Sequence, residues 1–263
     1  MNGPRRIVCL TEEPTEVLYA LGEQNRIVGI SGFTVRPAIA RKEKPKVSAF
    51  TSAKIGEILK LKPDFVVGFS DIQAEIASAL IQQGVEVWIS NHRSVDGILD
   101  YIQRLGALVG CAEKAIVYAD SLRANLDLVT QQSKNLSVRP KVYFEEWDVP
   151  LISGIQWVAE LIRIAGGDDI FPELAAESLA KNRIMADGSQ VIERNPDIIF
   201  GSWCGKKFRP EKLTARTNWQ SINAVKHKQL FEIRSPIILQ PGPAALTDGL
   251  AMMSKYIQAW KAS

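Results

Sequence analysis

The sequence has few of the residues that mark reactive centres. Its 263 residues include two histidines and three cysteines, Cys9, Cys111 and Cys204, and no two cysteines are spaced as in a CxxC motif. An odd number of cysteines argues against a full disulfide framework. No cysteine and histidine spacing matches a zinc motif. The sequence therefore predicts a reduced compartment and no metal site.

Long apolar runs, phosphate-binding glycine motifs and a strong charge excess are also missing. No run approaches the roughly 18 apolar residues of a membrane span, and neither G-x-G-x-x-G nor a P-loop occurs. The net charge is only +3, with lysine and arginine spread along the chain, which disfavours a nucleic-acid partner. The first residues contain no apolar signal-peptide core. As it stands, the sequence predicts a cytoplasmic protein, or a periplasmic one if a signal peptide was removed.

What is present is the composition of a globular protein in which strands alternate with helices. Hydrophobic residues make up 46% of the chain and charged residues 23%, enough for a sizeable core. Short apolar runs predict strands at 6–10, 26–31, 64–70, 85–90, 141–147, 197–203 and 229–233. Amphipathic segments between most of them predict helices. This alternation predicts an α/β fold with mainly parallel sheets.

Residues 111–136 interrupt the alternation. The segment contains no glycine or proline, and its apolar residues recur at helical spacing. One long helix is therefore expected. The pattern alone fits either another crossover helix or a connector between two parts of the chain.

An internal repeat indicates that the chain has two similar halves. "EILKLKPDFVVGFS" at 57–70 aligns without gaps to "QVIERNPDIIFGSW" at 190–203, an offset of 133 (190 − 57). In both copies a proline ends a helix, an aspartate makes a turn, and an apolar strand ends at a glycine. The repeat predicts two Rossmann-like α/β lobes with the long helix between them.

Candidate ligand-binding residues follow from the ends of the predicted strands. Ligands of open α/β sheets lie beyond the carboxyl ends of the strands, so the ends of the two repeated strands would face a shared cleft. Acidic residues follow the first strand of each half, and loop aromatics supply apolar contact. The predicted set is Glu12, Glu13, Phe33, Phe50, Phe69, Ser70, Glu146, Trp147, Arg183, Trp203 and Gln240.

A catalytic site is harder to assemble from these residues. Cys204 would need a base, and only His92 and His227 are available. Paired carboxylates occur at Glu12/Glu13 and Glu145/Glu146, but neighbours on a strand point to opposite faces. We therefore expect no catalytic residues, and keep a metal- or thiol-dependent enzyme as the alternative from a different class.

Several segments together resemble the cobalamin/iron-siderophore substrate-binding family. They occur in the family's order from about Arg6 to Trp260, and include "RIVCLTEEPTEVLYALGEQNRIVGISG", "ILDYIQRLGALVG", "YFEEWDVPLISG" and "VIERNPDIIFGSW". The resemblance implies an N-terminal lobe at 1–110, a single rigid helix at 111–136 and a C-terminal lobe at 137–263. It also implies a ligand between the lobes and no required cofactor. Cobalamin or another corrinoid is the expected ligand, followed by haem or an iron-siderophore.

Two departures from the family's pattern concern the ligand and the partner. Phe50 keeps an aromatic residue thirteen positions before Pro63, whereas Arg183 replaces the aromatic expected at the matching position and would suit a carboxylate or phosphate. Relatives that deliver to an ABC transporter carry a docking glutamate on each lobe, where this chain has Gly56 and Ser189. The resemblance thus implies a binding protein for which an ABC transporter partner lacks its usual docking acids. A non-exported carrier or sensor is expected.

Overall fold

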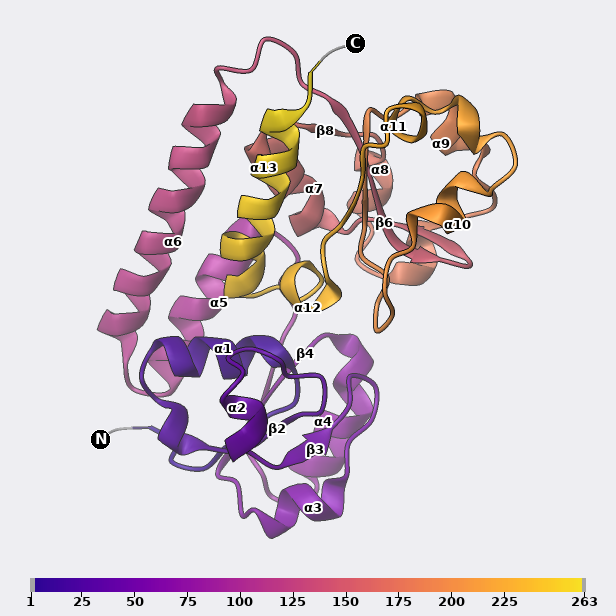
Figure 1. Cartoon of the computed structure of the whole chain (residues 1–263). Coiled ribbons are helices and arrows are strands. Elements are labelled where there is room, and N and C mark those ends of the chain that lie inside the picture. The colour runs from indigo at the N-terminus through magenta and orange to yellow at the C-terminus, as the bar shows by residue number, and fades with distance from the viewer. Residues whose placement is uncertain (1–2, 262–263) are drawn as a thin grey trace. The chain divides into compact units, whose positions relative to one another are not determined.

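The computed structural model describes residues 3–261, which divide into two compact units. Unit 1 contains the chain up to His92, Asp96–Arg123 and Gln240–Pro243. Unit 2 contains Arg93–Val95, Ala124–Leu239 and the chain from Ala244 onward. The long helix α6, Ala112–Ser133, begins in unit 1 and ends in unit 2 (Figure 1). Two α/β lobes sharing a long helix confirm the predicted fold class. The predicted domain limits at 110/111 and 136/137 stay a prediction.

Unit 1 is built on a five-stranded, wholly parallel sheet with the strand order β3-β2-β1-β4-β5. Its strands are β1 Ile7–Cys9, β2 Ile27–Ser31, β3 Lys46–Ser48, β4 Phe65–Phe69 and β5 Val87–Ser90. Its helices are α1 Glu12–Ala20, α2 Ala40–Glu43, α3 Ile55–Lys60, α4 Ala74–Ile81 and α5 Val95–Leu108, with short 3₁₀ turns at Gln24–Arg26 and Asp71–Gln73. Apolar side chains of β1 and β4 pack against Ile58 of α3 and Leu80 of α4 in one core cluster. Because both faces of a parallel sheet are covered, its strands are almost continuously apolar.

Unit 2 is built on a six-stranded sheet with the order β11-β10-β6-β7-β9, in which β8 also pairs with β6. Its strands are β6 Lys141–Asp148, β7 Leu151–Ser153, β8 Asp168–Asp169, β9 Ile184–Met185, β10 Ile198–Gly201 and β11 Leu230–Glu232. The pairs β6–β7 and β7–β9 are antiparallel, and the others are parallel. The sequence did not predict β7, β8 or β9, nor β3 in unit 1, because these strands of two or three residues lie outside any longer apolar run. The equally short β1 and β11 lie within such runs and were predicted.

The helices of unit 2 are mostly short. They are α7 Gln156–Ala165, α8 Pro172–Ala175, α9 Ser189–Arg194, α10 Pro210–Thr214, α11 Asn223–Lys226, α12 Ser235–Ile238 and α13 Leu250–Ala259, with short turns at Ala180–Arg183, Trp219–Ser221 and Ala245–Gly249. α13 lies against α7, both drawn in the upper part of Figure 1. α7 ends where Gly166 adopts the left-handed conformation, with φ of 102°.

The internal repeat is visible as matching backbone geometry in α3–β4 and α9–β10. Lys62 and Asn195 occupy equivalent positions before the repeated proline, and each has φ of 46°. The repeated aspartates do more than make a turn. Asp64 accepts backbone hydrogen bonds from Arg5 and Arg6 at 2.8 Å, and Asp197 accepts one from Lys141 at 2.9 Å. In each unit the aspartate thus fixes the start of the neighbouring strand, β1 or β6.

Candidate functional site

In unit 1 the five parallel strands end on one edge of the sheet, and the predicted aromatic residues follow two of them. Phe33 follows β2 and is 53% exposed, and Phe50 follows β3 and is half-buried. The buried side chain of Gln73 accepts from the Phe69 backbone N–H and donates to the Phe50 carbonyl, both at 3.0 Å. This amide bridge fixes the loop that carries Phe50 relative to β4. Two loop aromatics are therefore presented to solvent on a rigid edge.

Glu12 and Glu13 form a buried acidic pair at the same edge. Both lie in the first turn of α1 and not on a strand, and both are buried, contrary to the expectation that one acid of the pair points outward. Burial and the neighbouring charges of Glu13 and Glu16 raise the pKa of Glu12 to about 8. Burial also raises the pKa of Glu13 to about 7, although Thr11 donates a 2.6 Å hydrogen bond to its Oε1. The other oxygen, Oε2, has no hydrogen-bond partner among the described residues.

Phe69 and Ser70 face the interior of unit 1. Phe69 is 5% exposed and meets the ring of His92 edge-on at 5.2 Å, and His92 stacks on Tyr101 at 4.5 Å. His92 Nε2 lies 2.7 Å from the Pro241 carbonyl, so this nitrogen is the donor, and in the neutral ring Nδ1 accepts from the Ser90 hydroxyl at 2.8 Å. Ser70 is 1% exposed. Both predicted contacts therefore act within the core in this structure, where they offer a ligand almost no surface.

In unit 2 the carboxyl end of β6 carries a buried ion pair around Glu145. Glu145 is 0% exposed and accepts two parallel hydrogen bonds from Arg216, at 2.6 and 2.9 Å. The indole N–H of Trp203 also donates to Glu145, at 2.9 Å. Burial raises the pKa of Glu145 against the lowering effect of Arg216. These bonds hold β6 to the segment after β10.

Trp203 presents almost no surface to solvent in this structure, and its contact with ligand stays a prediction. Trp203 is 1% exposed and lies in the core cluster of unit 2, with Phe208 edge-on at 5.2 Å. An indole whose N–H bonds a buried carboxylate fills the core and positions Glu145. Cys204, the next residue, is exposed.

Arg183 is held by Glu146 and is not available on the surface. It is 2% exposed and donates to both oxygens of Glu146, at 2.6 and 3.3 Å, and to the Ser153 carbonyl. The sequence placed Arg183 against a ligand carboxylate or phosphate, but a carboxylate of the chain itself takes that position. Its guanidinium fixes the end of β6, where the Glu146 side chain is 19% exposed.

Trp147 presents a half-buried indole next to Lys206. Its N–H donates to the Val149 carbonyl at 2.7 Å, which fixes the ring. Lys206 Nζ lies 4.0 Å above the ring and donates to the buried carboxylate of Asp148. Lys212 Nζ lies 3.7 Å from the same carboxylate. Burial raises the pKa of Asp148, but the bond from Lys206 and its charge outweigh this and leave the pKa below its ordinary value.

The predicted set therefore separates by exposure. Partly or fully exposed members are Phe33, Phe50, Glu146, Trp147 and Gln240, whereas the buried ones are Glu12, Glu13, Phe69, Ser70, Arg183 and Trp203. Lys206, Lys212 and Arg216 were not predicted from the sequence as residues of the candidate site. Five basic residues and a single acid in "KKFRPEKLTAR", directly after the repeated strand, were the signal that could have identified them.

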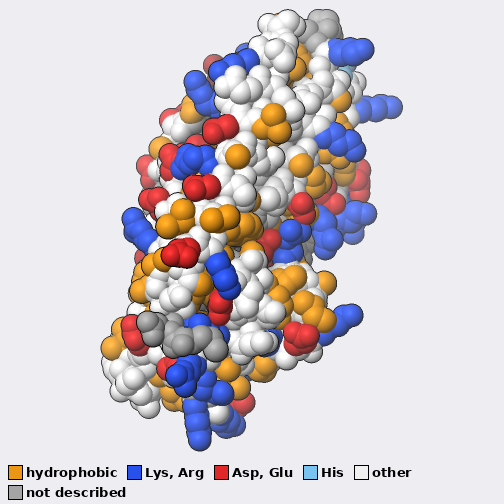
Figure 2. All heavy atoms as spheres, turned by 90° about the vertical axis from the view of Figure 1, so that its left-hand side faces the viewer, with side chains coloured by type: hydrophobic (Ala, Val, Ile, Leu, Met, Phe, Trp, Pro, Cys, Tyr) orange, Lys and Arg blue, Asp and Glu red, His pale blue; other side chains and the backbone are white. Residues whose placement is uncertain are grey.

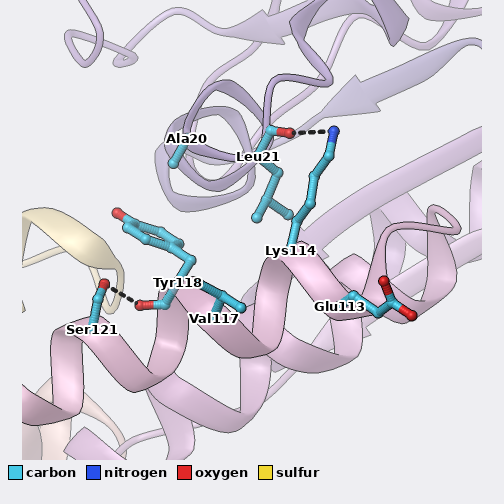
Figure 3. A pocket seen from close by; sticks show the side chains of 7 residues that line it. All are labelled: Ala20, Leu21, Glu113, Lys114, Val117, Tyr118 and Ser121. Carbon is cyan, nitrogen blue, oxygen red and sulfur yellow. Dashed lines mark hydrogen bonds between the residues drawn. The ribbon is translucent and has the colours of Figure 1, made fainter.

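Two hollows lie elsewhere on the described residues. A hollow of about 500 Å³ between α1 and α6 is shown in Figure 3, lined by Ala20, Leu21, Glu113, Lys114, Val117, Tyr118 and Ser121. Lys114 is bonded there to the Leu21 carbonyl at 3.3 Å. Another, of about 540 Å³, lies beside α7 and α8. On the face in Figure 2, acidic and basic side chains are intermixed with apolar ones. Neither hollow lies at the carboxyl edge of its sheet, where ligands of such folds bind.

Residues 3–261 contain neither a metal-binding cluster nor a membrane-spanning helix. No group of three or more histidine, cysteine, aspartate or glutamate side chains there is arranged to hold a metal ion. None of the helices in that range combines the length and apolar character needed to cross a bilayer.

Comparison with known proteins gives consistent matches over most of the chain. The profile described as "Periplasmic binding protein" matches residues 7–237. A "Vitamin B12-binding protein" of Vibrio vulnificus is 24% identical over 248 residues, 92% of this chain and 86% of that protein. An "Uncharacterized ABC transporter substrate-binding lipoprotein" of Bacillus subtilis is 25% identical, over 97% of this chain and 80% of that protein.

Solved structures show the same fold. The periplasmic vitamin B12-binding protein of Vibrio cholerae superposes with a TM-score of 0.77 at 23% identity, covering 97% of each chain. A periplasmic haem-binding protein of Pseudomonas aeruginosa superposes with a TM-score of 0.82 at 18% identity, covering 98% of this chain and 94% of that one. At these identities the likeness concerns the fold alone.

Proposed function

Since the chain belongs to the periplasmic binding protein family, we propose that it is a non-enzymatic binding protein whose ligand is cobalamin or another corrinoid. Relatives named as vitamin B12-binding proteins, similar over most of their length, support this ligand class.

The observation that carries the proposal is the set of aromatic side chains at the carboxyl edges of the two sheets. Phe33 and Phe50 in unit 1 and Trp147 in unit 2 are at least partly exposed on positions fixed by hydrogen bonds or strand ends. Aromatic faces bind large apolar surfaces at little cost in side-chain entropy. A macrocycle such as a corrin offers such a surface, with polar groups at its rim.

Haem or an iron-siderophore is the second candidate. It is favoured by two basic side chains, Lys206 over Trp147 and Lys212 near Asp148, because haem carries two carboxylates and many siderophores are anionic. A haem-binding protein of the same fold is consistent with this alternative.

The test is incubation of the purified chain with cyanocobalamin or haem, followed by desalting and an absorption spectrum. We expect the cobalamin spectrum to stay with the protein. Retention of haem alone would replace the leading ligand by the second candidate, and a colourless protein after both incubations would overturn the proposal.

A thiol- or metal-dependent enzyme remains the competing class. Both ring nitrogens of His92 are engaged within unit 1, which argues against His92 as the base for Cys204. We expect Cys204→Ala and His92→Ala to retain most of the wild-type ligand affinity, measured by titration. Turnover of the bound ligand that disappears in Cys204→Ala would instead favour the enzyme.

An ABC importer is the partner that the relatives suggest, and we propose that any docking here uses acids other than the family's glutamates. Gly56 and Ser189 are exposed, and each lies close to an acid of the chain. Glu57 adjoins Gly56, and Asp187 accepts hydrogen bonds from the backbone and hydroxyl of Ser189. Pull-down of the importer with wild type but not with Glu57→Gln/Asp187→Asn would support this docking.

Fractionation of native cells would show whether the chain works outside the cytoplasmic membrane.

A further inference from the structure

The segment after β10 is a loop rich in basic residues, and its backbone is anchored in the core of unit 2. Residues 202–216 contain Lys206, Lys207, Arg209, Lys212 and Arg216 against one acid, Glu211. Phe208 is 3% exposed, packs edge-on against Trp203, and donates its backbone N–H to Glu232 at 3.0 Å. The turn before Lys206 depends on Gly205, whose φ is 73°. The lysines therefore project from a backbone that is anchored in the core of unit 2.

The carboxylates at the end of β6 do not neutralise all of this positive charge. Arg216 neutralises Glu145 and Arg183 neutralises Glu146, each through both carboxylate oxygens. Asp148 forms ion pairs with two lysines, a close one with Lys206 and a more distant one with Lys212. Two cations share one carboxylate, so the cluster has capacity for a further anion.

The two lysines lie over tryptophan rings, of which Trp147 is half-buried and Trp203 is buried. Lys206 lies above both Trp147 and Trp203, at 4.0 and 5.1 Å from the ring centres, and Lys212 lies 5.6 Å from the centre of Trp203. The side chains of Lys206 and Lys212 are 37% and 54% exposed, whereas that of Asp148 is 5% exposed. A solute at this surface thus meets the ammonium groups and the Trp147 ring before it meets the carboxylate.

We infer that Lys206, which lies over Trp147, and Lys212, which shares Asp148 with Lys206, form a subsite for an anionic arm of the ligand, a phosphate or a carboxylate, while the ligand's apolar body lies on the Trp147 indole. The inference rests on the proposed function, because it assigns part of the ligand to this surface. Cobalamin has a phosphate in its nucleotide loop, and haem has two propionate carboxylates. Lysine suits either group, since its ammonium acts as a mobile point charge. Asp148 holds the lysines in place before the ligand arrives.

The experiment compares ligands with and without the anionic arm. Titrations use cyanocobalamin against dicyanocobinamide, which lacks the nucleotide loop and its phosphate, and haem against haem dimethyl ester. The variants are Lys206→Gln, Lys212→Gln and Lys206→Arg, with Lys226→Gln at the exposed end of α11 as the matched control. Circular dichroism verifies that each variant is folded.

We expect Lys206→Gln and Lys212→Gln each to weaken cyanocobalamin binding about 5-fold at low salt, the size of a partly exposed charge pair. The affinity for cobinamide should be unchanged in these variants. Lys206→Arg should keep most of the wild-type affinity for cyanocobalamin. About 1 M salt should reduce the difference in affinity between the wild type and the Lys→Gln variants. The same pattern with haem but not its diester would identify a carboxylate as the arm. Equal affinity of the wild type and Lys206→Gln, or equal losses for cobalamin and cobinamide, would overturn the subsite and leave the proposed function standing. No binding of cobalamin or haem by the wild type would overturn both.

Discussion

At the residue scale, two non-glycine residues in the left-handed conformation mark the repeated helix ends. Lys62 and Asn195 have the same φ of 46° immediately before Pro63 and Pro196. Asparagine tolerates this region, whereas a lysine loses about 1 kcal/mol or more relative to glycine there. The equal φ in both units shows that the repeat is a property of backbone geometry as well as of sequence.

Replacing Lys62 by glycine should therefore stabilise the chain. We expect Lys62→Gly to raise the free energy of unfolding of unit 1 by about 0.5–1 kcal/mol, because glycine adopts a positive φ without a Cβ clash. The control Lys60→Gly, at the last residue of α3, should lower it by about 0.5 kcal/mol, through some loss of helix propensity and of the exposed ion pair with Glu57. Urea denaturation measures both, and a destabilised Lys62→Gly would contradict the expectation.

The buried acids Glu12 and Glu13 make stability depend on pH in a defined direction. Their pKa values in the folded chain, about 8 and about 7, lie above those of exposed glutamates, so the folded state binds more protons than the unfolded state between about pH 4.5 and pH 8. The stabilisation is complete below pH 4.5 and is lost as the pH rises through the folded pKa values. We expect a slope of up to about 1.4 kcal/mol per pH unit and group.

The double variant Glu12→Gln/Glu13→Gln should flatten this slope and unfold at a higher urea concentration than wild type at pH 9. Denaturation at pH 5, 7 and 9 provides the test, with Glu113→Gln on the exposed start of α6 as the control. An unchanged slope in the double variant would show that other groups carry the pH dependence.

At the element scale, one aspartate in each unit fixes a strand to its neighbour. Asp64 accepts from the backbone N–H groups of Arg5 and Arg6 just before β1, and Asp197 does the same for Lys141 at the start of β6. A hydrogen bond to a charged acceptor is stronger than a neutral one, so these carboxylates set where each central strand begins.

Removal of the Asp64 carboxylate should loosen the start of β1 in unit 1. Asp64→Ala is expected to cost about 1 kcal/mol of unfolding free energy, since two backbone donors must find water instead. Asp100→Ala, which breaks only a 3.8 Å surface ion pair with Arg104, should change it by less than about 0.5 kcal/mol. Equal effects of the two substitutions in urea denaturation would refute the assignment. Hydrogen exchange at β1 should quicken only in Asp64→Ala.

At the scale of the whole molecule, binding and folding are linked. A ligand that binds only the folded chain stabilises it by about 2.7 kcal/mol when its free concentration is 100 times Kd. Cyanocobalamin should therefore raise the Tm in a concentration-dependent manner, as followed by circular dichroism. Riboflavin, a pigment without a macrocycle, serves as the control and should leave the Tm unchanged. A Tm that responds to neither compound would contradict the proposed ligand class.

The sequence by itself determined the two α/β lobes, the long helix and the repeated helix–strand unit. Strands such as Phe65–Phe69 and Ile198–Gly201 are apolar runs bounded by proline, aspartate and glycine, and this local information is sufficient to place them. It also placed Phe33, Phe50 and Trp147 at strand ends or loops, because the carboxyl edge of a parallel sheet follows from strand order and direction alone.

Only the tertiary structure decided which of these side chains are available. Trp203 and Arg183 lie at positions that the sequence favours for ligand contact, yet Glu145 and Glu146 bind them within unit 2. Lys206 lies over Trp147 because its loop is anchored by Phe208, which packs against Trp203. The physical reason is that burial and ion pairing depend on partners far apart along the chain. Trp203 and Glu145, for example, are separated by 58 residues. No local pattern encodes such pairs.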